Sequence, residues 1–442
     1  MDYDLLIENV DIVSPGDAVR RGHSVAVAGE TIADIQPAAV LQGRTAGRRI
    51  DGRGGLCSPG FVNVHNHTPL MAVRGMFEDR GFAPAYTKGV PQGHWLGDAE
   101  TFALARLGLA EMLLQGCTSV VDFYARPQAL AAAMAETGLR GYIGGRIMDV
   151  DTAALAEGKV VADPALGERT LADSLALFDA WHGAGDGRIQ CILAPHAPDT
   201  CSPALMRSVA DIAARDDIRV HTHLAQSPLE ATRVQAAYGR SPTELLDENG
   251  LLNARLTAAH CIAVSDDDIA RIARSGAFVA HVPVGNATGG QSAPIEALHA
   301  AGAPIALSTD SKSGCMLDAM RMALRVARIR AGGRLVFDAA TAFAWGTVGG
   351  AASLGHGAVL GRIRPGCLAD IVLFDPEAPN LRPVVDGVGV LVHSGSGFNV
   401  QTVIVGGEIL VEDRRPVRYD LSAVIREAQD VADALWARVQ AG

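Results

Sequence analysis

The stretch Gly60–His67 reads GFVNVHNH and places two imidazoles two residues apart at the end of an apolar run. Residues i and i+2 of a β-strand point to the same face, so His65 and His67 converge at the carboxyl end of that strand. Converging imidazoles are typical of a metal site, although an isolated pair is equally compatible with two packed histidines. The rest of the chain must decide between these interpretations.

Further short apolar runs follow from about residue 59 to residue 357, separated by segments with helical periodicity. This alternation predicts an α/β fold with a parallel sheet. With the first run they are FVNVHNH, SVVDFY, GYIGGRI, IQCILAPH, RVHTHLA, LTAAHC, FVAHVP and PIALSTD. Eight such units make a (βα)8 TIM-type barrel the economical architecture.

The connecting segments carry helix signals. Asp98 is expected to cap a helix that Gly116 ends, and a second helix is expected to run from Ser265 to Gly276. The last segment, residues 421–439, has helical periodicity and predicts a terminal helix.

The two ends of the chain resemble each other in pattern. Residues 3–57 alternate β-like runs with Gly and Asp turns, which predicts a small antiparallel sheet, and the same pattern returns after about residue 357. We therefore expect a composite β-sandwich formed from the N- and C-terminal segments. The expected domains are the N-terminal part of the sandwich (1–58), the barrel (59–357), and the C-terminal part with its helix (358–442).

Composition excludes several classes of function. The 442 residues are 48% hydrophobic and carry a formal net charge of -11, with no basic run to bind phosphate backbones or anionic membranes. The seven cysteines are odd in number and widely spaced, as expected of reduced thiols. With neither a signal peptide nor a membrane span expected, we predict a cytoplasmic protein. Homo-oligomers are common among such proteins, so we expect one here.

Polar residues gather at the ends of the predicted strands, where barrel enzymes carry their chemistry. Seven of the 13 histidines lie there, together with one aspartate. They are His65, His67, His196, His221, His223, His260, His281 and Asp310. This clustering favours a functional site over packed histidines.

The order of these motifs carries a resemblance. HxH, then HTHLA, AHC and STD, framed by SPGFVNVHNH and ADIVLFD, resembles the amidohydrolase superfamily. The match is to its mononuclear branch of cytosine deaminases, adenosylhomocysteine deaminases and triazine hydrolase-like enzymes, and APHAPDTCS and HVPVGNATGG extend it over nearly the whole chain.

The resemblance implies one divalent metal ion bound by His65, His67, His223 and Asp310, with a position left for water. Three imidazoles and a carboxylate suit zinc, while iron, manganese or cobalt remain open. Asp310 would also accept the water's proton. The alternative role for Asp310 is an N-cap for the segment after the eighth strand.

The other histidines are assigned smaller roles. By the same resemblance, His260 would polarise the substrate's carbonyl or steady the attacking hydroxide, and otherwise it is a packed core residue. His196 is expected to orient the substrate, and His221 to support the metal ligands. His281 either takes part in catalysis or bonds a loop.

One position departs from the family pattern. Similar deaminases carry a proton-shuttling glutamate three residues after the fifth-strand ligand, where this chain has Gln226. An amide cannot exchange a proton usefully near neutral pH. We therefore favour hydrolysis of an amide, urea or carbamate C–N bond, with Gln226 orienting the substrate. The alternative is deamination of a purine, pterin, pyrimidine or triazine, in which His281 replaces the missing acid.

The segment after the first strand has the length of a loop over the barrel mouth. Its apolar residues either wall a substrate site or pack the loop down. They are Met71, Met76, Phe77, Phe82, Tyr86 and Trp95. We expect Trp95 and Phe82 to contact a small-molecule substrate. A noncatalytic relative of these enzymes is a third hypothesis, which the presence of all four ligands disfavours.

Overall fold

The computed structural model describes residues 2–80, 83, 86–311 and 313–441. Each of the eight predicted runs contains a β-strand, and neighbouring strands pair in parallel. The strands are β5 (Phe61–Asn66), β6 (Cys117–Tyr124), β7 (Arg140–Ile147), β8 (Ile189–Cys191) with β9 (Ala194–Pro195), β10 (Val220–Leu224), β11 (Leu256–His260), β12 (Phe278–His281) and β13 (Ile305–Leu307). The parallel α/β prediction is confirmed.

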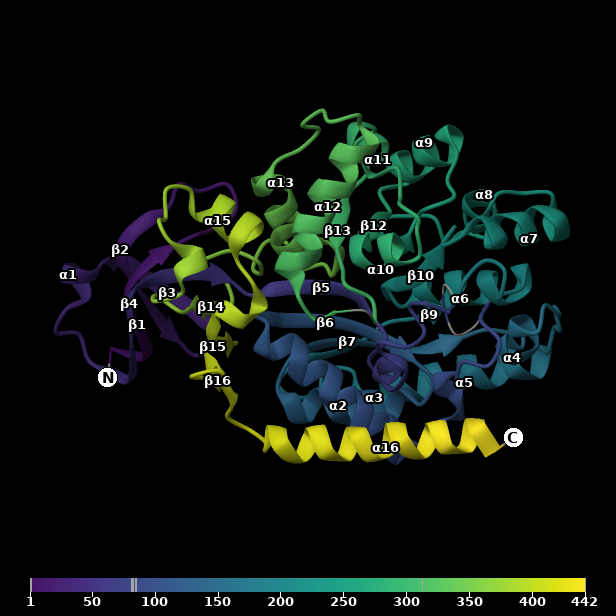
Figure 1. Ribbon diagram of the computed structural model, residues 1–442, viewed down its shortest axis with the longest axis horizontal. Helices are drawn as coiled ribbons and strands as arrows, with labels where there is room; N and C mark the ends of the chain where they lie inside the picture. The colour runs from purple at the N-terminus through teal and green to yellow at the C-terminus, as the bar shows by residue number, and fades with distance from the viewer. Residues whose placement is uncertain (1, 81–82, 84–85, 312, 442) are drawn as a thin grey trace.

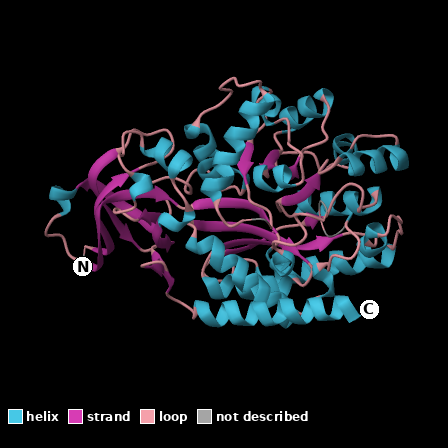
Figure 2. Ribbon diagram, in the orientation of Figure 1, coloured by secondary structure: helices cyan, strands magenta, loops and turns pink. Residues whose placement is uncertain are grey.

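These strands form two sheets, ordered β5-β6-β7-β8 and β10-β11-β12-β13, with β9 paired to β7. A parallel bridge between Leu193 and Val220 links them. Val62 and Val64 of the first sheet share one buried cluster with Ala280 and Ala306 of the second. The two sheets therefore face a common core. Figure 2 shows their strands at the centre of the molecule with helices above and below them.

Helices alternate with these strands, and their ends follow the local sequence. α9 starts after the N-cap Ser265, whose hydroxyl accepts from the Asp268 amide, and stops at Gly276 with φ 73°. The expectation for Asp98 is wrong by one residue, because Gly97 is the N-cap and Glu100 accepts from its amide at 2.9 Å.

The longer helices are α2 (Asp98–Leu114), α3 (Pro127–Thr137), α5 (Pro164–Trp181), α6 (Pro203–Arg215), α7 (Pro228–Tyr238), α9 (Asp266–Ser275), α12 (Met316–Arg330), α15 (Gly387–Ser394) and α16 (Leu421–Ala441). The shorter ones are α1 (Ala38–Leu41), α4 (Thr152–Ala156), α8 (Pro242–Glu248), α10 (Pro283–Thr288), α11 (Ile295–Ala300), α13 (Ala339–Ala344) and α14 (Gly350–Ser353).

Both ends of the chain join one eight-stranded sheet, ordered β17-β16-β15-β14-β4-β1-β2-β3. Its strands are β1 (Tyr3–Ile12), β2 (Arg20–Ala28), β3 (Thr31–Pro37), β4 (Ala46–Pro59), β14 (Ile371–Phe374), β15 (Val400–Val405), β16 (Glu408–Glu412) and β17 (Arg415–Pro416). The two ends meet where β14 pairs antiparallel with β4. Because β1 and β4 run parallel, the N-terminal strands are mixed rather than purely antiparallel.

The predicted terminal helix is present as α16, which runs along α2 (Figure 1). The Trp436 indole donates a hydrogen bond to the Ala72 carbonyl at 2.8 Å. This bond attaches α16 to the start of the loop after β5. None of the helices in the described part of the chain combines the length and apolar character that crossing a bilayer requires.

Candidate metal centre and substrate cavity

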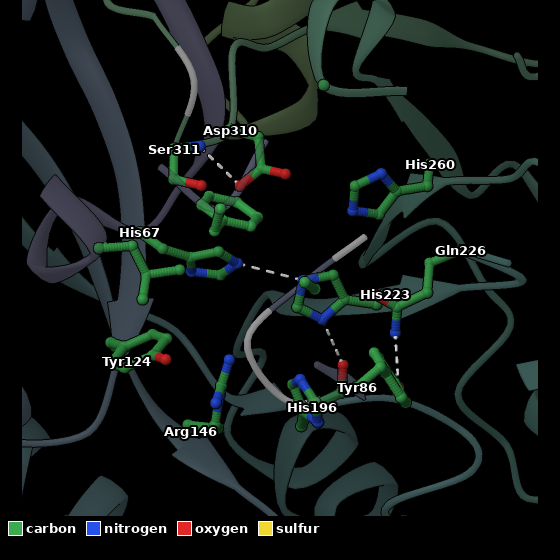
Figure 3. Close-up of a pocket in the computed structure, with 14 residues that line it drawn as sticks. His67, Tyr86, Tyr124, Arg146, His196, His223, Gln226, His260, Asp310 and Ser311 are labelled. Atoms are coloured by element: carbon green, nitrogen blue, oxygen red, sulfur yellow. Dashed lines mark hydrogen bonds between the residues drawn. The ribbon is translucent and has the colours of Figure 1, made fainter. Parts of the chain in front are cut away.

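Five of the eight strand-end residues line one cavity at the carboxyl ends of the parallel strands (Figure 3), namely His67, His196, His223, His260 and Asp310. His67 follows β5, His223 lies in β10, His260 ends β11 and Asp310 follows β13. The three histidine side chains are at most 4% exposed. Residues up to 243 positions apart in sequence, His67 and Asp310, therefore line one cavity, as the parallel alternation predicted.

His67 and His223 present unprotonated nitrogens to each other. The Nδ1 of His67 donates to the Phe123 carbonyl at 2.8 Å, and the Nδ1 of His223 donates to the His196 carbonyl at 2.7 Å. A carbonyl oxygen only accepts, so both Nε2 atoms carry lone pairs, and these atoms are 3.1 Å apart. Imidazole nitrogens bound to one ion at about 2.0–2.1 Å stand roughly 3 to 3.4 Å apart, so a shared cation fits here.

His65 and Asp310 extend this pair into a ligand set. His65 Nε2 is buried without a hydrogen-bond partner, while its Nδ1 lies 2.8 Å from His221 Nε2. The ligand atoms of His65, His67 and His223 all lie within 4.8 Å of one another, and so do those of His65, His260 and Asp310. Each of the four predicted ligands belongs to one of these two groups, which share His65, and His260 belongs to the second.

Burial keeps these imidazoles neutral. It lowers the pKa of His67 to about 4, and the pKa values of His65 and His223 fall well below the ordinary range for the same reason, reinforced by the neighbouring histidines. Neutral imidazole is the form that binds a metal ion. The donor set therefore fits a divalent cation at neutral pH.

Asp310 is held where the two sheets meet. Its amide donates to the His65 carbonyl at 3.1 Å, and its Oδ1 accepts from the Ser311 amide at 2.6 Å. Its φ of 56° is unusual for a residue other than glycine and marks a constrained turn. The next helix, α12, has Cys315 as its N-cap, so Asp310 does not cap it.

The remaining histidines differ in their surroundings. His260 Nδ1 is 2.9 Å from Asn286 Oδ1, and His196 Nδ1 is 2.8 Å from Thr200 Oγ1. His196 and His260 line the cavity. His281 is buried in β12 with neither ring nitrogen bonded to the described residues, and it is not among the residues that line the cavity.

The loop after β5 supplies part of the cavity wall. Phe77 and Tyr86 line the cavity, whereas Met71 packs in a buried cluster with Leu435 of α16. Trp95 is 45% exposed and is not a lining residue. Phe82 lies outside the described residues, and the substrate contacts of both remain predictions.

The cavity also contains residues that the sequence did not single out. Arg146, at the end of β7, lines it, is 8% exposed, and has a buried Nε without a hydrogen-bond partner. Its guanidinium lies 4.1 Å from the centre of the Tyr124 ring, another lining residue. The strand-end rule that selected the histidines would have found Arg146 in GYIGGRI.

Comparison with known proteins identifies the family. The sequence pattern of the amidohydrolase family matches residues 56–410. The chain belongs to this family. It is therefore an enzyme of the amidohydrolase type, which acts on C–N bonds other than peptide bonds.

The chain is 32% identical over 422 residues to the 5-methylthioadenosine/S-adenosylhomocysteine deaminase of Pelotomaculum thermopropionicum, covering 93% of this chain and 94% of that protein. Among solved structures, an adenosine deaminase of Xanthomonas campestris with bound zinc is 28% identical with a TM-score of 0.87, covering 98% of each chain. A variant of the atrazine chlorohydrolase of Arthrobacter aurescens, complexed with zinc and atraton, is 25% identical with a TM-score of 0.87, covering 97% of this chain and 100% of the other.

These relatives confirm the predicted branch, which joins adenosine-type deaminases with triazine hydrolases. Members of the family bind a metal ion, and the histidine cluster is the corresponding feature of this chain.

Proposed function

We propose that this enzyme hydrolyses a C–N bond at a carbonyl-type carbon of a small molecule, as in an amide, urea or carbamate. The facing Nε2 atoms of His67 and His223, 3.1 Å apart beside Asp310, carry this proposal. One zinc ion per chain, held by His65, His67, His223 and Asp310, is the proposed cofactor, with iron, manganese or cobalt as other metals. When bound, such a cation would lower the pKa of a water molecule toward neutrality.

Asp310 is the proposed proton carrier. Its Oδ1 already accepts from the Ser311 amide, so Oδ2 is the oxygen that takes the proton of the attacking water and passes it to the departing nitrogen. His260 donates through Nδ1 to Asn286, so the neutral ring has its lone pair on Nε2. That lone pair accepts a hydrogen bond from the attacking water, which is the second of the two roles expected for His260.

The substrate side would be formed by His196, Gln226 and Arg146. Arg146 brings a buried positive charge with an unpartnered Nε, so it would bind an anionic or strongly accepting group of the substrate. Trp95 and Phe82 remain proposed substrate contacts. His281 remains a proposed catalytic residue, acting only if the ring-deamination alternative holds.

The second candidate is deamination of a nitrogen heterocycle. The relatives' own activities favour it, since the chain matches deaminases of adenosine-type compounds over nearly its whole length. Gln226 opposes it, because that reaction requires protonation of a ring nitrogen and an amide supplies no acidic proton.

The remaining proposals concern architecture and setting. We propose that the two parallel sheets are parts of a (βα)8 barrel (59–357) and that the terminal sheet belongs to a composite β-sandwich (1–58 and 358–442). Cytoplasmic location, a homo-oligomer, and the absence of nucleic-acid and membrane partners remain predictions from the sequence.

One experiment separates the two candidates. Metal content per chain is measured on protein purified without chelator, and the same sample is assayed for release of amine or ammonia from amides, ureas, carbamates and heterocyclic amines. About one equivalent with cleavage of the carbonyl compounds supports the proposal. Ammonia from purines or pterins without any carbonyl cleavage would replace it with the deaminase.

A further inference from the structure

Gln226 lies at the start of a buried chain of polar groups behind the cavity (Figure 3). Its Nε2 is 3.1 Å from the Tyr86 hydroxyl, which is 3.1 Å and 3.3 Å from the two carboxylate oxygens of Asp199. Asp199 has a side chain only 1% exposed and lies 3.6 Å from the Arg233 guanidinium. Three segments that are distant in sequence are therefore joined by one chain of hydrogen bonds, which runs from Asp199 through Tyr86 to the Gln226 amide.

The hydrogen bonds in this chain have a defined direction. An ionised carboxylate only accepts, so the Tyr86 hydroxyl gives its single hydrogen to Asp199 and accepts from Gln226. The amide nitrogen of Gln226 must then face Tyr86, and its Oε1 lies on the other branch of the amide. The Glu230 carboxyl group also bonds the Gln226 side chain, so Asp199 and Glu230 together set this orientation, which does not depend on the substrate.

The charge on Asp199 is favoured by its neighbours. Burial raises the pKa of both Asp199 and the adjacent Glu230, but Tyr86 and Arg233 oppose the shift at Asp199, whereas the pKa of Glu230 rises to about 8. Glu230 therefore holds a proton at neutral pH, while the Tyr86 hydroxyl and the Arg233 guanidinium favour the ionised form of Asp199. Burial and the charge of Asp199 also raise the pKa of Tyr86 well above its ordinary value, so its hydroxyl stays protonated.

The backbone at Gln226 is fixed as well. Glu230 accepts from the Ala225 amide at 2.9 Å and from the Gln226 amide at 2.8 Å, and its own amide donates to Ser227 Oγ at 3.2 Å. Ala225 has a φ of 47°, which fits a tight turn held by these bonds. The residue is therefore restrained at its main chain by Glu230 and at its side chain by Tyr86.

We propose that Tyr86 and Asp199 position the Gln226 amide so that its Oε1 accepts an N–H of the substrate, which makes the enzyme selective for compounds with an N–H next to the reacting carbon. This inference rests on the proposed hydrolysis at the metal centre. Ureas, secondary amides and lactam-type rings carry such a group. In adenine-type rings the nitrogen next to the reacting carbon carries a lone pair instead of a hydrogen, and this lone pair would be repelled by those of Oε1.

The expected selectivity is large because both partners are buried. A site built to hydrogen-bond a substrate N–H rejects an analogue without it by factors that reach about 10⁴. Tyr86 is in this view a positioning residue, since it acts through Gln226. Its removal should change the preference among substrates more than it changes metal binding.

The test uses matched pairs of compounds. Guanine and 2-aminopurine carry the same exocyclic amine, but only guanine has a ring N–H beside the reacting carbon. For the carbonyl reaction, acetanilide has one N–H beside the carbonyl carbon and N-methylacetanilide has none. We expect kcat/KM to favour the N–H member of the hydrolysed pair at least about tenfold in the metal-loaded enzyme. Equal rates, or a preference for the member of the pair that lacks this N–H, would overturn the inference while leaving the proposed function intact.

Variants then locate the origin of the preference. Tyr86→Phe should reduce it at least about threefold at unchanged metal content, because the amide is then free to rotate, and Gln226→Glu should reverse it. Tyr124→Phe removes a hydroxyl from the same cavity without touching this chain of bonds, so its preference ratio should match that of the wild type. An unchanged ratio in Tyr86→Phe would overturn the positioning role. A metal-loaded wild type that hydrolyses no compound in the wider panel would instead refute the proposed function.

Discussion

The two sides of the cavity are built in different ways. The proposed metal side consists of residues at or just after the ends of β5, β10, β11 and β13, and strand direction and alternation determine where their side chains point. The opposite side depends on loops, with Tyr86, Asp199 and Gln226 joined by hydrogen bonds across large distances in sequence. A short motif can therefore predict the first side, whereas the second exists only once the chain has folded.

The largest effect should come from the metal side. Asp310→Asn removes the proposed proton carrier and weakens the ligand set, so we expect kcat to fall by about 10²–10⁴-fold. Steady-state kinetics and metal analysis on the folded variant provide the measurement. Ser311→Ala is the matched control, because the bond to Asp310 comes from its backbone amide and survives. A loss in Asp310→Asn no greater than in this control would contradict the assignment.

The second prediction concerns a buried ion pair outside the cavity and its contribution to the free energy of unfolding. Arg140 at the start of β7 pairs with Asp370 at 3.1 Å, with side chains 8% and 1% exposed, and Asp370 also accepts from the Gly406 amide. Asp370→Ala leaves a buried charge unpaired, which typically costs about 3–5 kcal/mol. Urea unfolding measures this loss, while kcat per metal-loaded folded molecule should stay the same.

The matched control for this pair lies on the surface. Lys88 and Glu157 are 2.8 Å apart with side chains 74% and 47% exposed. Water and salt screen such a pair, so Glu157→Gln should leave the unfolding curve unchanged. Equal effects of the two substitutions would show that the terminal sheet is not anchored through Arg140.

Arg146, at the end of β7, tests the proposed substrate-binding part of the cavity and should give an intermediate effect. Removing its charge with Arg146→Met should lower kcat/KM by about 10–100-fold, the equivalent of roughly 1.5–3 kcal/mol for a hydrogen bond to a charged group. Arg146→Lys should recover only part of this, because an ammonium lacks the planar fork of donors. If Arg146→Met changes kcat/KM by less than twofold, the arginine does not contact the substrate.

These contrasts explain how much the sequence could reveal. The eight runs that contain parallel strands, the shared terminal sheet and the gathering of histidines and Asp310 at strand ends follow from periodicity, whereas the choice of His65, His67, His223 and Asp310 as ligands follows from the family resemblance. The exposure of Trp95 could not be foreseen, because aromatic residues in a long loop have no period that assigns them a face. Asp199 and Glu230 look like ordinary charged residues in the sequence, and only their burial beside Tyr86 and Gln226 distinguishes them.

The last prediction concerns Glu230 and the pH dependence of stability. Its folded-state pKa of about 8, raised by burial, exceeds the ordinary value of 4.5. Between these values the folded protein holds a proton that the unfolded chain has released, so this residue makes the protein less stable as pH rises from 4.5 to 8. Glu230→Gln removes that titration, and the variant should therefore gain stability relative to the wild type between pH 5 and pH 8.

Comparing variant with wild type isolates this contribution. The buried histidines act in the opposite direction, since their lowered pKa values make the folded protein less stable as pH falls below 6.5, but they are common to both proteins and cancel in the difference. Urea unfolding at pH 5, 6.5 and 8 gives the difference directly, with Glu248→Gln on the exposed end of α8 as the control expected to show none. A difference for Glu230→Gln that stays constant across this range would place the shared proton on Asp199, and the Gln226 amide would then lose the charge that orients it.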